Sequence, residues 1–452
     1  MSGPSKRLLI PSIVVWCAVL VVSAILRPLQ LDEVMQLMST RAPHPAAVLD
    51  SLGARPGSVP IGYLLQWALV RIAGFSNLVA RLPSVAAAIL TVFAIRRLGL
   101  RLGLGGLTVL TAIVVVIPML FRYSIEGRPY LPAFRLTVFA TLLLLELPER
   151  PSPGRLVVYG LTLASAPLLQ GTAATVTIAH GLFVLTDRTI RRDRSRQLAL
   201  LAAIGVGVLI PVAWSLRMRN AWAQAIVHDH YTFAVTFRTV AGFLKDLTGG
   251  GLVCTGLLVV GAVYGYARAN LPEQGKHLLV LTVLTAICGA VASDALAGYF
   301  TSPRQAIYCL CGLIVLAAAG GERLQSRYPL PAILAVTVFA AVSLARDVSV
   351  VRSKEDWKAA SGMLAQAVAQ GFCLEPDSDL TSSLPLYSLF DPSLEGHRCS
   401  GSDDKVGLVH SSYTSRQTHD SAAAALERRG FLVAGTRAGG GSTLDLYLKR
   451  PS

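Results

Sequence analysis

Charged residues are scarce in this sequence, and they are unevenly placed. Asp, Glu, Lys and Arg make up 15% of the 452 residues, whereas a soluble globular domain carries about 25%. Residues 1–346 consist of apolar segments separated by short charged loops, while residues 347–452 have the composition of a soluble domain. A buried helix rarely needs about 18 nearly uncharged residues in a row. The sequence therefore excludes a purely soluble protein and predicts a polytopic α-helical membrane protein.

A nucleic-acid-binding motif is also lacking, although the net charge is +15. The arginines cluster between apolar segments, as in residues 188–196. Neither a basic helix nor an RNA-binding signature accompanies them. Basic residues between membrane spans are better explained by membrane topology, so we expect no nucleic-acid partner.

Cysteines are few, and most of them lie where a thiol serves only as a small apolar group. Two of the seven, Cys373 and Cys399, lie in the polar tail. They are a candidate disulfide pair if the tail lies in an oxidising compartment. The other five lie in apolar segments, where packing is the simplest role: Cys17, Cys254, Cys288, Cys309 and Cys311.

Eleven apolar segments are predicted to cross the membrane. The segment 59–74 is not among them because it is short and contains Gln66 and Arg71. We predict that it forms a helix along the membrane interface. The predicted spans lie near 8–26, 79–98, 104–121, 131–147, 156–170, 172–186, 197–216, 251–267, 278–293, 305–320 and 329–346.

The short basic loops predict the orientation. If Lys6 and Arg7 lie in the cytoplasm, eleven spans also place the basic loops 96–101, 188–196 and 323–327 inside, as the positive-inside rule requires. The tail 347–452 then lies outside the cell membrane, and we predict that it is a small extracytoplasmic α/β domain with a helix at 422–429 and a strand at 444–450. The other outside segments are 27–78, 122–130, 217–250 and 294–304.

Two groups of charged residues outside the spans are candidates for chemistry. Asp32 and Glu33 closely follow the first span, where ionisable groups need a reason; the simpler alternative is a solvated charge pair. In the loop 122–130, arginines are either a phosphate pocket, because a guanidinium donates two parallel hydrogen bonds, or anchors that reach lipid headgroups. The candidate residues of this loop are Arg122, Glu126, Arg128 and Tyr130.

Two further candidates are weaker. Arg304 lies at the mouth of the tenth span, either as a second phosphate contact or as an interface anchor. His228-Asp229-His230 is a poor metal motif because histidines at i and i+2 do not share a helix face. We expect no cofactor; a divalent metal is left open, but no set of residues indicates one.

Five motifs, in order, give the sequence a resemblance to the C-type membrane glycosyltransferases. It resembles in particular the branch of protein O-mannosyltransferases and lipid A aminoarabinose transferases. One departure is that the family's Pro-Pro pair is reduced to Val59-Pro60 with no lysine before it, so Arg55 is the nearest cationic substitute. The motifs are LDEVMQL (31–37), VPIGYLLQWALVRIAG (59–74), ARLPSVAAAILTVFAIRRLG (80–99), IEGRPYL (125–131) and KEDWKAA (354–360).

The resemblance implies sugar transfer from a polyprenyl-phosphate donor to a lipid, polysaccharide or protein acceptor on the outer face of the inner membrane. Phosphate is a weak base and leaves without a strong general acid, whereas the acceptor hydroxyl needs one carboxylate base. Cations belong at the leaving phosphate. We therefore expect inversion, with Asp32 as the base and Glu33 as its supporting neighbour. The expected donor-site residues are Arg128, Glu126, Tyr130, Arg122, Arg55 and Arg304.

Two alternatives stay open at this point. One is a flippase or other transporter of lipid-linked glycans, although transporters often have internal repeats and polar residues at mid-depth of their spans, and neither is evident here. The other is a non-catalytic subunit of a glycan assembly system that kept the fold; the intact Asp32-Glu33 pair argues against it.

Overall fold

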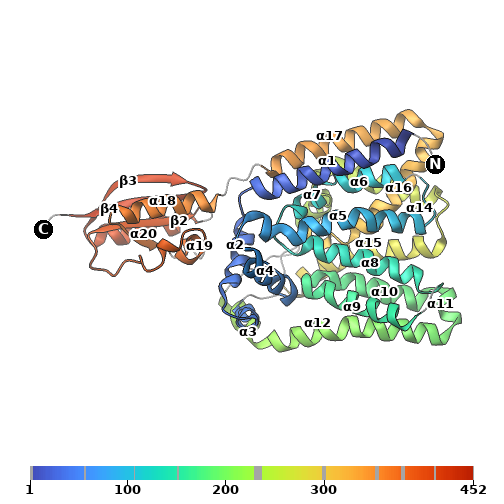
Figure 1. The fold of residues 1–452 in the computed structure, drawn as a ribbon, viewed down its shortest axis with the longest axis horizontal. Helices are drawn as coiled ribbons and strands as arrows, with labels where there is room; N and C mark the ends of the chain where they lie inside the picture. Colours follow the sequence, from blue (N-terminus) through green and yellow to red (C-terminus); the bar gives the residue numbers. More distant parts are fainter. Residues whose placement is uncertain are drawn as a thin grey trace. The chain divides into compact units, whose positions relative to one another are not determined.

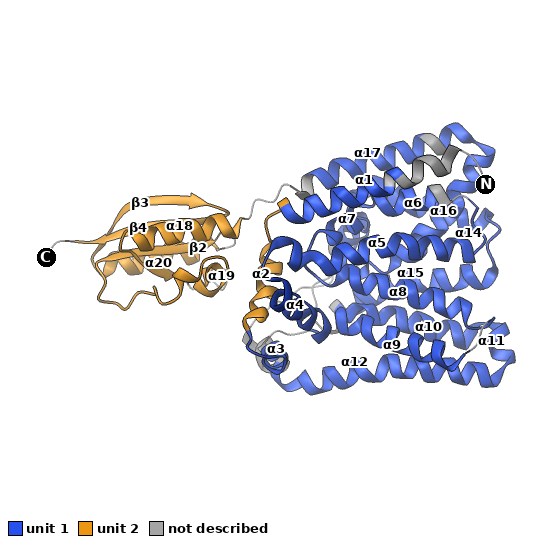
Figure 2. Cartoon of the chain, in the orientation of Figure 1, with its two compact units in different colours: residues 1–25, 42–350 blue, residues 26–41, 351–452 orange. Residues whose placement is uncertain are grey.

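The computed structural model describes residues 4–54, 58–105, 107–149, 152–228, 237–297, 302–351, 356–377, 382–411 and 414–450. The chain divides into two compact units (Figure 2). Unit 1 comprises Met1–Ile25 and Ala42–Val350, and unit 2 comprises Leu26–Arg41 and Val351–Ser452. The boundary predicted from the sequence, 346/347, falls inside the last helix of unit 1. The short segment Leu26–Arg41, which carries Asp32 and Glu33, belongs to the same unit as the tail.

Unit 1 is helical throughout its described residues (Figure 1). Each of the eleven segments predicted as spans is helical, as is the segment 59–74, which forms α4. The main helices are α1 (Pro4–Leu26), α3 (Pro45–Ser51), α4 (Pro60–Ala73), α5 (Asn77–Arg101), α6 (Leu107–Val116), α7 (Pro118–Ser124), α8 (Tyr130–Glu146), α9 (Pro153–Leu169), α10 (Ala174–Thr186), α11 (Arg188–Arg192), α12 (Arg194–His228), α13 (Phe237–Lys245), α14 (Gly251–Arg268), α15 (Glu273–Ala297), α16 (Cys309–Arg327) and α17 (Pro329–Val351).

The predicted span 104–121 is interrupted. Its helices α6 and α7 are separated by Ile117, whose backbone is extended with φ −66° and ψ 119°. Pro118 explains the break, because proline offers no backbone N–H and disfavours a helical conformation in the residue before it. The second piece, α7, leads directly into the loop that carries the candidate arginines.

Within the described residues, five helices are long and apolar enough to cross a membrane. The number is six if the bent pair Ile13–Leu26 and Leu31–Arg41 counts as one span. The other predicted spans are helical but do not pass this criterion as single helices, so the total of eleven crossings stays a prediction. The chain is a helical membrane protein. The five helices lie in Asn77–Arg101, Arg194–Ala221, Gly251–Arg268, Glu273–Ser293 and Pro329–Val348.

Helix α16 lies at the centre of unit 1. Every residue from Cys309 to Gly320 is buried, whereas α12 and α17 expose large apolar side chains such as Leu209 and Leu334. An apolar exterior around a buried helix is expected in a bilayer, where lipid, not water, covers the outer helices. The burial of Cys309 and Cys311 also agrees with their role as packing residues.

Helices α14 and α16 approach each other through glycines. A Cβ built on Gly265 would overlap the carbonyl oxygen of Leu316, and one built on Gly320 would overlap the carbonyl oxygen of Gly261. Small residues at such positions let backbones pack closely, which is a main source of helix association in membranes. The contact therefore depends on the absence of side chains.

We expect Gly265→Ala to destabilise unit 1 by about 1–3 kcal/mol, the usual cost of overpacking. Gly256→Ala is the matched control, because a Cβ built on Gly256 of the same helix meets nothing within 4 Å. Thermal unfolding of both variants in detergent measures the difference. Equal midpoints for the two variants would show that the helices do not pack in this way.

Unit 2 contains a four-stranded sheet with the order β1-β2-β4-β3. Strand β1 pairs parallel to β2, and the other two pairs are antiparallel. This agrees with the predicted α/β composition, and the predicted helix and final strand are both present. The elements are α2 (Leu31–Leu37), α18 (Trp357–Ala369), β1 (Cys373–Pro376), α19 (Leu384–Ser388), β2 (Lys405–Ser411), α20 (Arg416–Arg428), β3 (Phe431–Gly439) and β4 (Ser442–Lys449).

The segment KEDWKAA marks the beginning of α18. The Asp356 side chain accepts a hydrogen bond from the Ala359 N–H at 3.0 Å and so caps the helix. Trp357 is buried against Tyr387, with ring centroids 5.2 Å apart. In this chain the described part of the motif therefore has a structural role inside unit 2.

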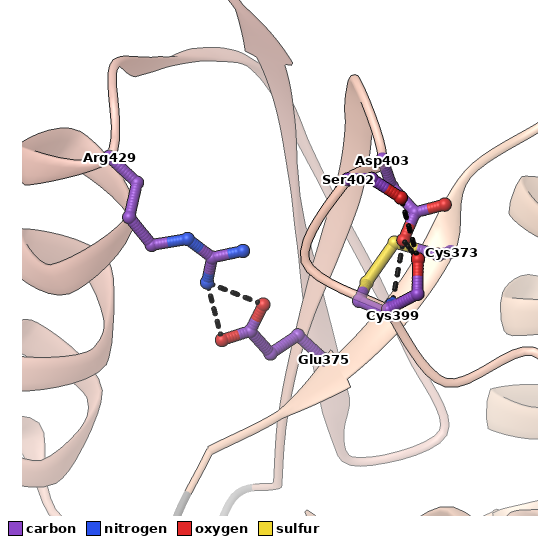
Figure 3. The surroundings of a disulfide bond; sticks show 7 residues. Cys373, Glu375, Cys399, Ser402, Asp403 and Arg429 are labelled. Carbon is purple, nitrogen blue, oxygen red and sulfur yellow. Dashed lines mark hydrogen bonds and ion pairs between the residues drawn. A yellow bond between two sulfur atoms is a disulfide. The ribbon is translucent and has the colours of Figure 1, made fainter.

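A disulfide joins Cys373 of β1 to Cys399, with 5.0 Å between their Cα atoms (Figure 3). Beside it, the backbone N–H and hydroxyl of Ser400 donate to Asp403 Oδ2. These bonds hold the pKa of Asp403 below its usual value. Both cysteines also pack against the apolar core of Val406, Leu408, Leu426, Phe431 and Tyr447.

Replacing both disulfide cysteines by serine is expected to destabilise unit 2 by about 3 kcal/mol, because the bond closes a loop of 26 residues in the unfolded chain. Cys288→Ser is the control, since Cys288 is a free and exposed thiol. Thermal unfolding and mass spectrometry of non-reduced peptides measure the effect. Alkylation of Cys373 and Cys399 without reductant would contradict the pairing.

Candidate functional site

Helix α4 holds the loop IEGRP in place. The Gln66 side chain is buried and donates hydrogen bonds to the carbonyl oxygens of Gly127 and, at 3.1 Å, Ala80. One amide therefore links α4 to the loop and to α5. A buried amide is costly unless it is paired. These two hydrogen bonds therefore explain why a polar residue, Gln66, is found in the apolar segment 59–74.

Helix α5 provides two further polar contacts. Ser84 donates to the carbonyl oxygen of Arg128 at 3.0 Å, which fixes the loop from a second side. Arg81 is fully buried and donates to the carbonyl oxygen of Ala24, near the end of α1, at 3.0 Å. Both residues belong to the Arg-Leu-Pro segment, so this segment supports the candidate loop and the end of α1.

The loop itself ends at Pro129, the N-cap residue of α8. Tyr130, the first residue of α8, is buried with its ring centroid 4.8 Å from that of Tyr123 on α7. The guanidinium carbons of Arg128 and Arg304 each lie 5.8 Å from the Tyr130 centroid. Two cations therefore converge on one aromatic ring, within the range of a cation–π contact.

The convergence of Arg128 and Arg304 makes these two residues the candidate phosphate contacts, a role that stays a prediction. A phosphate that contacted both guanidinium groups would be held by two positive charges. Each fork can donate two parallel hydrogen bonds to phosphate oxygens. Arg304 lies in the short 3-10 helix Pro303–Ala306, just before the buried helix α16 and far away in the sequence, so only the fold brings it to Tyr130.

Arg122 and Glu126 form an ion pair across the turn. Arg122 Nε lies 3.6 Å from Glu126 Oε2; the Arg122 side chain is 46% exposed and that of Glu126 is 2% exposed. A buried carboxylate needs a partner, so Glu126 holds Arg122 and orients the loop. This arrangement favours a supporting role for Glu126 over direct contact with a phosphate, which it would repel.

In unit 2, Asp32 and Glu33 lie in the first turn of α2. Glu33 is fully buried, and its Oε2 accepts the Gln30 N–H at 2.9 Å in a capping box. Asp32 is only half-buried. The two carboxylates thus have different surroundings: Glu33 begins the helix, while Asp32 keeps access to solvent.

The segment after α2 is anchored within unit 2. Arg41 donates to Glu395 Oε1 at 2.8 Å and to Ser388 Oγ at 3.1 Å. The sequence showed no signal for this attachment, because the partners are more than 300 residues apart. It joins the segment that carries Asp32 to the tail.

Three predictions fall outside the described residues. These are the cationic substitute Arg55 and the residues Asp229 and His230 of the weak metal motif. His228 ends α12. The donor-site role of Arg55 stays a prediction from the sequence.

The described chain also contains an apolar cavity of about 470 Å³ between α6, α14, α16 and α17. Its lining includes Val109, Leu258, Ala317 and Phe339 and none of the charged candidates. This cavity lacks the convergent polar groups of a catalytic site.

Comparison with known proteins finds one protein family and several solved structures that this chain resembles. The profile of the family described as dolichyl-phosphate-mannose-protein mannosyltransferase matches residues 55–214. ArnT from Cupriavidus metallidurans, solved in the apo state and bound to undecaprenyl phosphate, has 14% identity and a TM-score of 0.68, and the alignment covers 98% of both chains. The arabinofuranosyltransferase AftD from Mycobacteria has 14% identity and a TM-score of 0.55, covering 97% of this chain and 41% of its own. No curated protein sequence matches.

The chain therefore has the fold of the C-type membrane glycosyltransferases. Residues 55–214 also resemble the protein mannosyltransferase family in sequence, and the fold is similar to that of ArnT along the whole chain. The resemblance drawn from the five sequence motifs is confirmed.

Proposed function

We propose that the protein is an inverting glycosyltransferase that moves a sugar from a polyprenyl-phosphate donor to a lipid, polysaccharide or protein acceptor. The observation that carries this proposal is the convergence of Arg128 and Arg304 on Tyr130. A cationic pair of this kind suits a phosphate leaving group, whose negative charge grows as the bond to the sugar breaks. The structure of ArnT with undecaprenyl phosphate adds support from the same fold.

Asp32 is the proposed base. The acceptor hydroxyl must lose its proton as it attacks the anomeric carbon, and a partly exposed carboxylate can take that proton. Glu33 is less suitable because its carboxylate is buried and already accepts the Gln30 N–H. One base and one leaving phosphate define a single in-line displacement, which inverts the anomeric carbon. A retaining enzyme would need a second carboxylate as nucleophile.

Arg128, Arg304 and Arg122 are proposed to bind the donor phosphate, with Arg55 as the substitute for the family's lysine. Tyr130 holds the first two arginines, and Glu126 orients Arg122. We place this site on the outer face of the inner membrane, with the N-terminus in the cytoplasm, eleven crossings and unit 2 outside. The short basic loops support that orientation.

Conversion of the donor separates this proposal from a transporter. Vesicles containing the full-length protein are supplied with a lipid extract from a deletion strain, in which unused donor accumulates, and with delipidated envelope material as acceptor. We expect mass spectrometry to show polyprenyl-phosphate sugar being converted to polyprenyl phosphate, and the Asp32→Asn protein to leave it unconverted. A donor that crosses the bilayer chemically intact would instead identify a transporter.

A further inference from the structure

A second cluster of chemically competent side chains lies in unit 2, apart from the residues of the proposed transferase. His410, His419 and Asp445 each offer one ligand atom, and these atoms lie within 4.8 Å of one another. His419 Nε2 is 2.8 Å from Asp445 Oδ2, and His410 Nε2 is 3.6 Å from the same oxygen. The second distance is beyond a hydrogen bond, and His410 Nε2 is buried without one within the described residues.

The sheet register brings these residues together. Asp445 is on β4, with Thr436 of β3 as its partner on one side and Leu408 of β2 on the other. His410 lies two residues beyond Leu408, so it is the diagonal neighbour of Asp445. His419 is on α20, which packs on the sheet through Leu426. Two strands and a helix therefore converge on one point.

The surroundings of the cluster orient its ligand atoms. Asp420 Oδ1 lies 3.2 Å from His419 Nδ1, and Thr436 donates to Asp445 Oδ1 at 2.6 Å. A histidine that binds a metal through Nε2 commonly donates its Nδ1–H to a carboxylate, which fixes the ring and its tautomer. The Thr436 bond leaves Oδ2 of Asp445 directed at the two imidazoles.

Electrostatics distinguish the two histidines. Burial, then the neighbouring His419, lowers the pKa of His410 below its usual value, although Asp445 and Asp377 act in the opposite direction. Burial also disfavours charge on His419, but hydrogen bonds to Asp445 and Asp420 outweigh it and raise its pKa.

We propose that unit 2 binds one divalent transition-metal ion through His410 Nε2, His419 Nε2 and Asp445 Oδ2. Ligand atoms around a four-coordinate Zn²⁺ with bonds of about 2.0–2.2 Å lie roughly 3.3 Å apart. The two distances to Asp445 Oδ2, 2.8 and 3.6 Å, lie on either side of that spacing. Two imidazoles and one carboxylate favour zinc or its neighbours over Mg²⁺ and Ca²⁺, which prefer all-oxygen sites.

Three protein ligands leave one position of a four-coordinate ion to a further ligand. The side chains of His410 and His419 are 19% and 24% exposed, so part of each ring faces solvent, while His410 Nε2 itself is buried. A fourth ligand is left to water or to Asp377, which follows β1 and acts electrostatically on His410. The ion would tie α20 to β2 and β4 and stabilise unit 2 in proportion to its affinity.

Zinc binding to the full-length protein in detergent tests this proposal. The protein carries an affinity tag without histidines and is stripped with a chelator, and calorimetry then counts bound Zn²⁺. We expect His410→Gln/His419→Gln to bind one equivalent less than wild type and each single variant to lose at least about 100-fold in affinity. Asp420→Asn should lose about 10–100-fold, the usual cost of removing a supporting carboxylate.

His397→Gln is the matched control, because His397 is an exposed histidine of the same unit; it should bind Zn²⁺ as wild type does. Co²⁺ substitution gives a second measurement that needs no variant, since a four-coordinate site produces intense visible absorption. Wild type that binds no more Zn²⁺ than the double variant, or Co²⁺ without that absorption, would show that the cluster is only a His419–Asp445 hydrogen bond with His410 beside it.

Discussion

Asp32→Asn is expected to lower the turnover of sugar transfer by about 10²–10⁴-fold, the contribution typical of a positioned base. Asparagine keeps the size of aspartate and most of its hydrogen-bonding capacity but cannot accept the acceptor's proton. The loss should therefore appear in kcat, while the KM for the donor changes little. Steady-state measurement of polyprenyl phosphate release gives both constants.

Two other carboxylates, Glu33 and Asp50, supply controls for this experiment. Glu33→Gln should have a smaller effect, because a glutamine oxygen can still accept the Gln30 N–H in the capping box. Asp50→Asn makes the same chemical change at an exposed residue of α3 and should leave transfer unchanged. If Glu33→Gln is more damaging in kcat than Asp32→Asn, with unfolding unchanged, the two roles are the reverse of those proposed.

The helices of unit 1 could be predicted from the sequence because long apolar segments have few alternatives in a bilayer. The exception is the break at Ile117. There the hydropathy of 104–121 suggested one span, although Pro118 was a visible local signal. Hydropathy reports how apolar a segment is and does not report backbone hydrogen bonding, so it overlooks an interruption inside an apolar segment.

The candidate site was predictable only in part. The motif IEGRPY identified Arg128 and Tyr130, but the joint contact of Arg128 and Arg304 with one ring depends on how the start of α8 packs against the short 3-10 helix Pro303–Ala306. Gln66 and Arg81 were missed as supports of the site. A signal existed for both, because a polar residue within an apolar helix needs a buried partner.

The His410–His419–Asp445 cluster could not be found from the sequence. Its residues have no metal-binding spacing, and the only candidate considered there was His228-Asp229-His230. Asp445 meets His410 because β2 and β4 pair in one particular register. A shift of one residue would send Asp445 to the other face of the sheet, so the site depends on tertiary structure alone.

Arg128→Lys is expected to lower kcat/KM for the donor by about 10- to 100-fold. Lysine keeps the positive charge but replaces a planar fork by a single ammonium group, and a hydrogen bond to a charged partner contributes roughly 1.5–3 kcal/mol. Arg97→Lys is the control. Arg97 is an exposed arginine near the C-terminal end of α5, where it forms an ion pair with Glu146 of α8. Donor titration and thermal unfolding of both variants separate lost binding from lost folding.

Arg304→Lys completes the test, because Arg128 and Arg304 lie at the same distance from the Tyr130 ring. If both arginines bind one donor phosphate, the double variant should deviate from the sum of the single effects by about 0.5–3 kcal/mol, as residues that share a partner do. Additive losses would mean that the arginines act at separate places. Wild-type kcat/KM in Arg128→Lys would mean that the guanidinium only anchors the loop, and the phosphate site would have to be assigned elsewhere.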